Sequence, residues 1–91
     1  MKKHIIISGQ VQGVGFRYWL QALAIRKEVF GWVRNLNTGQ VEALLIGEEK
    51  PIHELIEECK LGPSNSFVEH VKIDNAKDQC LEKSFEILPT K

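Results

Sequence analysis

The sequence has few cysteines, few prolines and no long apolar run. Its 91 residues include three prolines and only two cysteines, Cys59 and Cys80. A small secreted domain usually carries several disulfides, so two thiols far apart in the chain favour a reducing compartment. A Cys59–Cys80 disulfide is the less favoured alternative. We therefore expect a chain that is stabilised by its hydrophobic core rather than by cross-links.

The sequence also lacks an excess of charge of either sign. Twelve Lys and Arg residues balance twelve Asp and Glu residues. Nucleic-acid-binding domains usually carry a net basic surface, so this balance argues against a nucleic-acid partner, although it leaves room for one local positive site. The first apolar run ends at Ile7 and is shorter than the core of a signal peptide. No segment approaches the roughly 20 apolar residues of a membrane span. We predict a cytoplasmic monomer that does not bind membranes.

The apolar pattern predicts one domain over residues 1–91. Strands are expected where β-branched and aromatic residues cluster or alternate, and helices where apolar residues recur three or four positions apart. Turns are expected at short segments rich in Gly, Asn and Ser. The predicted strands cover residues 4–8, 29–36, 41–47, 67–74 and 84–88, and the predicted helices cover residues 16–28 and 51–59.

The order of these elements predicts an α+β fold. It is the order of the ferredoxin-like βαββαβ sandwich, followed by an extra short C-terminal strand. In this arrangement we expect an antiparallel sheet with both helices on one face. The fold alone assigns no function, because RNA-recognition modules share the same architecture.

The stretch GQVQGVGFRYW, residues 9–19, places three glycines beside an arginine between the first strand and the first helix. A dinucleotide-binding pattern fails because Tyr18 stands where the third glycine is needed, and a P-loop pattern fails because Val14 stands at its second glycine. The N–H groups of a tight turn and of a helix start still form a general anion site. Arg17 can add a bidentate contact with phosphate oxygens. Glycine content alone favours an ordinary turn.

Two longer patterns show a family resemblance. Residues 6–17 contain G-x-V-Q-G-V-x-F-R, a signature of the acylphosphatase family. Residues 31–47 match its second signature, G-aromatic-V-x-N-x-x-x-G-x-V with another glycine six positions on. A looser match follows at residues 62–71, where Gly-Pro precedes spaced valines. The chain therefore resembles this family over nearly its whole length.

The resemblance implies an enzyme that hydrolyses acyl phosphates to a carboxylate and inorganic phosphate, without a metal or another cofactor. Carried over by position, Arg17 binds the phosphoryl group and Asn35 holds the attacking water. Inorganic phosphate is then both the product and a competitive inhibitor. The phosphate-binding residues that the resemblance implies are Gln12, Gly13, Val14, Gly15, Phe16 and Arg17.

The chemistry of these residues suits such a reaction. A carboxylate leaving group has a conjugate-acid pKa of about 4, so it departs without being protonated first. The loose transition state of phosphoryl transfer depends on positioning and on electrostatic stabilisation, which Arg17 and backbone N–H groups can supply. Asn35 cannot act as a base at neutral pH, but its side-chain carbonyl can accept a hydrogen bond from water. Outside the second signature, Asn35 would be interpreted as an ordinary turn residue.

Two other functions stay open. The first is an RNA-binding module, because FGWV at residues 30–33 matches the centre of the RNP1 pattern. The flanks of that pattern fail, since Glu28 and Val29 replace its basic residue and glycine, and Asn35 replaces its last aromatic residue. The second is an acylphosphatase-like domain that handles carbamoyl phosphate without free hydrolase activity, a role that normally belongs to a much longer chain. The three histidines are scattered and form no zinc pattern.

Overall fold

The computed structural model describes residues 1–77 and 83–91. The predicted βαββαβ order with a further strand is confirmed. Pro51 lies in the first turn of the second helix, as its missing N–H favours. The elements are β1 Lys2–Gln10, α1 Phe16–Arg26, β2 Phe30–Asn35, β3 Val41–Ile46, α2 Glu49–Leu61, β4 Phe67–Asn75 and β5 Phe85–Ile87.

The strands form one sheet in the order β4-β1-β3-β2-β5. The first four of these pair antiparallel, as predicted. The fifth differs, because β5 pairs with β2 in parallel and makes the sheet mixed. The physical reason lies at the edge of the sheet. There β5 covers the otherwise open side of β2 and buries Phe85 to 4% exposure.

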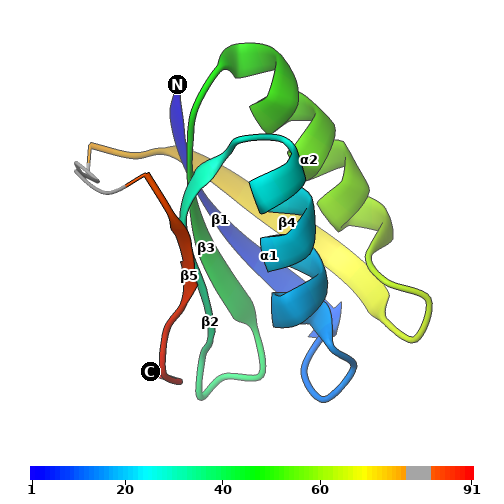
Figure 1. Cartoon of the computed structure of the whole chain (residues 1–91). Coiled ribbons are helices and arrows are strands. Elements are labelled where there is room, and N and C mark those ends of the chain that lie inside the picture. Colours follow the sequence, from blue (N-terminus) through cyan, green and yellow to red (C-terminus); the bar gives the residue numbers. More distant parts are fainter. Residues whose placement is uncertain (78–82) are drawn as a thin grey trace.

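Both helices pack on the same face of the sheet (Figure 1). Alternate residues of the strands point toward the helices, and the predicted apolar stripes of α1 and α2 point back at them. The core between the two layers therefore comes from both halves of the chain. Its largest fully buried side chains include Ile5, Ile7, Phe16, Leu20, Val33, Leu45, Ile52 and Leu55. Neither helix in the described part of the chain is long and apolar enough to cross a membrane.

Cys59 belongs to this core. Its side chain is completely buried, and burial raises the pKa of its thiol to about 12. The reactive thiolate is therefore not formed at neutral pH. Cys80 lies outside the described residues, so the alternative of a Cys59–Cys80 disulfide is not tested.

The other face of the sheet carries a polar cluster at its centre. The Glu42 carboxylate pairs with His4 Nε2 at 2.7 Å and with Arg34 Nε at 2.6 Å. Burial acts to raise the pKa of Glu42, but the hydrogen bonds from His4 and Arg34 outweigh it and lower the pKa below its ordinary value. The guanidinium carbon of Arg34 also lies 4.6 Å from the centre of the Trp32 ring. Trp32, one of the two aromatic residues of the FGWV segment, is therefore packed against Arg34 of the same strand.

Candidate active site

The glycine-rich loop joins β1 to α1 at one end of the sheet, beside the β2–β3 hairpin (Figure 1). Gly13 and Gly15 have φ angles of 74° and 78°. Residues with a side chain rarely adopt such angles, so these two turn positions favour glycine. A Cβ atom added at either position would meet nothing within 4 Å. The loop is therefore a tight turn whose outer surface is open.

Helix α1 begins at this loop without a cap. Gly15, the N-cap residue, has no side chain with which to cap the helix, and the first turn contains no acidic residue. The N–H group of Trp19 donates to the carbonyl oxygen of Gly15 at 3.0 Å. The N–H groups of residues 16–18 precede this bond and have no acceptor within the helix. Together with the helix dipole, these donors favour an anion at the loop.

Arg17 is the second residue of α1 and is partly exposed. Within the described ranges, no ion pair involves Arg17. Its guanidinium carbon lies 6.0 Å from the centre of the Tyr18 ring. The cation is therefore close to the uncapped helix start and is not neutralised by a described carboxylate.

Gln12 ties the loop to the β2–β3 hairpin. Its Nε2 donates to the carbonyl oxygens of Leu36 and Gln40 at 2.8 and 2.9 Å. Gln40 Nε2 in turn donates to Ser8 Oγ in β1 at 2.9 Å. Because the amide hydrogens of Gln12 are used in this way, its side chain holds the loop in place. Only its backbone N–H remains for an anion.

Asn35 is the last residue of β2 and lies on the helix-facing side of the sheet, in phase with buried Val33. Its carbonyl oxygen accepts a hydrogen bond from the Lys91 N–H at 3.0 Å. Its side-chain Oδ1 is buried and has no hydrogen-bond partner among the described residues. Buried polar atoms are nearly always paired, so this oxygen is an unused acceptor at the end of the sheet where the loop lies.

The structure thus brings the predicted site residues to one end of the molecule. The Gln12 bond to Leu36, the residue after Asn35, places loop and strand side by side. Sequence reasoning missed two contributions, the clamp made by the Gln12 side chain and the hydrogen bonds of Lys91. Both use backbone partners, which leave no mark in the sequence.

The hollows of the surface lie around α2, away from the loop. Two of them, of about 440 and 380 Å³, share His53 and Glu57 in their lining. Neither is lined by the loop or by Asn35. Over residues 1–77 and 83–91 there is no cluster of three His, Cys, Asp or Glu side chains that could hold a metal. The uncapped start of α1 and the buried Oδ1 of Asn35, rather than a cavity, make the loop and the end of β2 the candidate site.

Known proteins match this chain over nearly its whole length. The acylphosphatase family model matches residues 3–87. An acylphosphatase of Rhodopseudomonas palustris is 40% identical over 93 residues, which cover 97% of this chain and 94% of that protein. The crystal structure of acylphosphatase from Bacillus subtilis matches with a TM-score of 0.90 and 34% identity, covering 96% of this chain and 97% of that one. Full-length HypF, in its phosphate- and nucleotide-bound form, matches with a TM-score of 0.88 and 32% identity, but only 12% of it is covered.

Proposed function

The chain belongs to the acylphosphatase family and hydrolyses acyl phosphates, and we propose that it does so at the glycine-rich loop, with Arg17 and Asn35 as its catalytic residues. The relatives matched over nearly their whole length favour this function over RNA binding. They also favour it over the alternative of carbamoyl-phosphate handling without free hydrolase activity. The site assignment is supported above all by the buried Oδ1 of Asn35, which has no partner among the described residues and lies on the strand that Gln12 links to the loop.

In this proposal the phosphoryl group is held by the backbone and by one positive charge. The N–H groups of the loop and of the first turn of α1 donate to the phosphoryl oxygens, and Arg17 pairs with two of them. The positive φ angles of Gly13 and Gly15 support this, because they turn the backbone sharply before the helix. The same donors stabilise the charge on the equatorial oxygens in the transition state.

Asn35 positions the nucleophile. Its Oδ1 accepts a hydrogen bond from water, whose oxygen attacks phosphorus in line with the departing carboxylate. The new P–O bond forms as the bond to the acyl oxygen breaks, and the carboxylate leaves with the bonding electrons. One proton of the water passes to a phosphoryl oxygen, which gives dihydrogen phosphate. No acid is needed, because a carboxylate has a conjugate-acid pKa of about 4.

The proposed working form is a cytoplasmic monomer that uses no metal or cofactor and binds no nucleic acid. The apolar faces of both helices are covered by the sheet of the same chain, so neither needs a second chain to cover it. Two cysteines in 91 residues support a reducing compartment, and balanced charge argues against a nucleic-acid partner. Size-exclusion chromatography with light scattering tests the monomer directly, and a dimer mass would contradict it.

Hydrolysis of benzoyl phosphate tests the proposal. Wild-type protein should turn this substrate over equally well with and without a chelator, and inorganic phosphate should inhibit competitively. Arg17→Ala should lose phosphate binding and at least about a hundredfold in kcat, because it removes a charged donor to the transition state.

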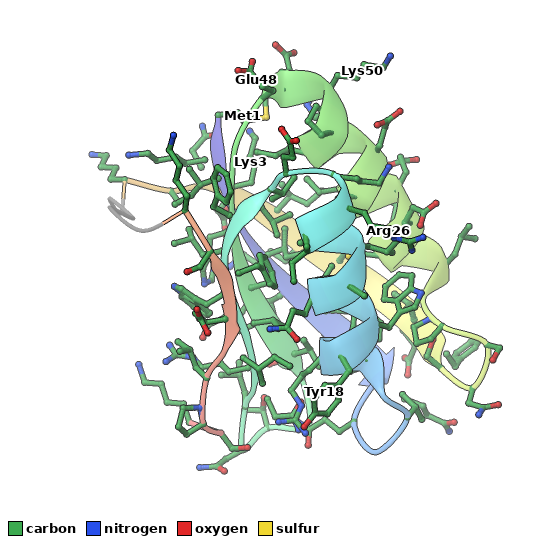
Figure 2. The ribbon with its side chains drawn as sticks, in the orientation of Figure 1. Met1, Lys3, Tyr18, Arg26, Glu48 and Lys50 are labelled. Atoms are coloured by element: carbon green, nitrogen blue, oxygen red, sulfur yellow. The ribbon has the colours of Figure 1, made fainter. Side chains whose placement is uncertain are left out.

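Arg26→Ala is the matched control, since Arg26 is an exposed arginine in the last turn of the same helix (Figure 2). It should keep normal activity. Folded wild-type protein without turnover would contradict the function. Near-normal activity of Arg17→Ala would contradict only the role given to Arg17.

A further inference from the structure

Tyr18 is an exposed aromatic residue beside the proposed phosphate site. It is the third residue of α1, and 66% of it is exposed to solvent. Figure 2 shows it at the end of the helix where α1 begins. Single exposed apolar residues are common on protein surfaces, so exposure alone assigns no role. Tyr18 differs from an ordinary exposed residue because its ring lies at the start of α1, next to the loop.

A general property of helices and one observed distance place the ring toward the loop. Side chains in a helix lean toward its N-terminus and cover the surface that precedes their own Cα. For the third residue of α1, the surface that precedes it belongs to the loop, residues 13–15. The ring centre also lies 6.0 Å from the guanidinium carbon of Arg17. The ring is therefore next to the group that is proposed to hold the phosphoryl end of the substrate.

An acyl phosphate bound by the loop must direct its acyl group outward. The surface above Gly13 and Gly15 is open, because a Cβ atom built at either glycine meets nothing within 4 Å. The acyl group accordingly leaves the loop over open surface. There the Tyr18 ring offers an apolar face directly beside Arg17.

We propose that Tyr18 determines specificity by contacting the acyl group, so that the enzyme favours acyl phosphates with an aromatic acyl group over small ones such as acetyl phosphate. The inference rests on the proposed function, since it needs the phosphoryl group in the loop. Stacking between two aromatic rings adds favourable contact that a methyl group cannot match. The hydroxyl group of Tyr18 has no part in this contact, so phenylalanine should replace tyrosine.

The test compares kcat/KM for benzoyl phosphate and for acetyl phosphate in wild type, Tyr18→Ala and Tyr18→Phe. Tyr18→Ala should lose roughly three- to tenfold for benzoyl phosphate. It should keep its value for acetyl phosphate and its inhibition constant for inorganic phosphate. Tyr18→Phe should resemble wild type with both substrates. Ile25→Ala is the control, because Ile25 is 60% exposed on the same helix, one residue before its last.

Two results would overturn the inference. If Tyr18→Ala leaves the ratio between the two substrates unchanged, the ring does not select the acyl group. If it weakens both substrates and phosphate equally, the ring acts through Arg17 instead. Either result leaves the hydrolase function intact, whereas a wild type inactive toward both substrates would overturn the function together with the inference.

Discussion

At the scale of single residues, Asn35 stands out because its buried Oδ1 has no partner within the described residues. An unpaired buried acceptor costs about 1–3 kcal/mol of stability. Sequences that violate the rules of folding at one position usually do so where function requires it. The fold tolerates this oxygen at the end of β2, where the proposed function has it bind the attacking water.

Asn35→Ala should separate function from stability. We expect kcat for benzoyl phosphate to fall about a hundredfold or more, because the water loses its positioning group. Inhibition by phosphate should persist, since the loop and Arg17 remain. The free energy of unfolding should stay the same or rise, because an unpaired buried acceptor is removed. Urea denaturation and inhibition kinetics measure these quantities.

Asn37→Ala provides the control, because Asn37 is an exposed asparagine in the neighbouring turn. It should behave like wild type in both measurements. A folded Asn35→Ala protein that no longer binds phosphate would show that Asn35 holds the phosphoryl group rather than water.

The sequence indicates which residues are candidates for this site, but not how buried they are or which hydrogen bonds they make. The first signature marks Arg17 and the second marks Asn35 among the residues around them in the sequence. They do not reveal that Oδ1 is buried without a partner, because that depends on how distant segments pack. Nor do they show that the Gln12 amide is engaged, since its acceptors are backbone carbonyls that any residue would supply.

At the scale of elements, the site depends on how the loop and the β2–β3 hairpin are held together. Gln12 alone makes two hydrogen bonds across this junction, to the carbonyl oxygens of Leu36 and Gln40. The loop and the hairpin are separated in the sequence by α1. The relative position of Arg17 and Asn35 should therefore depend in part on the Gln12 side chain.

Gln12→Ala should lower kcat for benzoyl phosphate by about tenfold or more, because small misplacements of reacting groups are costly. The inhibition constant of phosphate should change much less, since the backbone donors and Arg17 remain. Gln10→Ala, at the exposed last residue of β1, is the control. An unchanged kcat in Gln12→Ala would show that other contacts hold the two elements in place.

Helices and strands with a strong apolar periodicity were predicted correctly. The direction in which the last strand pairs was not, because it depends on the neighbouring strand in the sheet. The apolar stripe of α2, with buried Ile52, Leu55, Ile56 and Cys59, was readable from spacing alone. The sequence of residues 84–88 predicted a short strand but neither its partner nor its direction. Its parallel pairing with β2 depends on which edge of the sheet is open, and this is a property of the assembled fold.

At the scale of the whole molecule, the sheet has one face covered by helices and one that carries the Glu42 cluster. Glu42 in β3 joins His4 of β1 and Arg34 of β2 across three neighbouring strands. Its pKa is lower in the folded chain than its ordinary value of 4.5. The ionised carboxylate therefore stabilises the fold above about pH 4.5, and this contribution is lost as the pH falls below that value.

Glu42→Gln should lower the free energy of unfolding at pH 7 by about 1–3 kcal/mol, because it removes charge-assisted hydrogen bonds. It should also weaken the loss of stability on acidification below pH 4.5. Urea denaturation at several pH values measures both effects. Glu86→Gln, at an exposed position in β5, is the control. Equal stability of the two variants at neutral pH would contradict a stabilising role for the cluster.

The hydrogen bonds of Lys91 bear on the order in which parts of the protein fold. The Lys91 N–H donates to the carbonyl oxygen of Asn35, and its own carbonyl oxygen accepts from the Asn37 N–H. These contacts join residues that are far apart in the chain, as do those between β1 and β4. Domains dominated by such non-local pairings fold comparatively slowly. During refolding, enzymatic activity should therefore return as a late event, after helices and local hairpins have already formed.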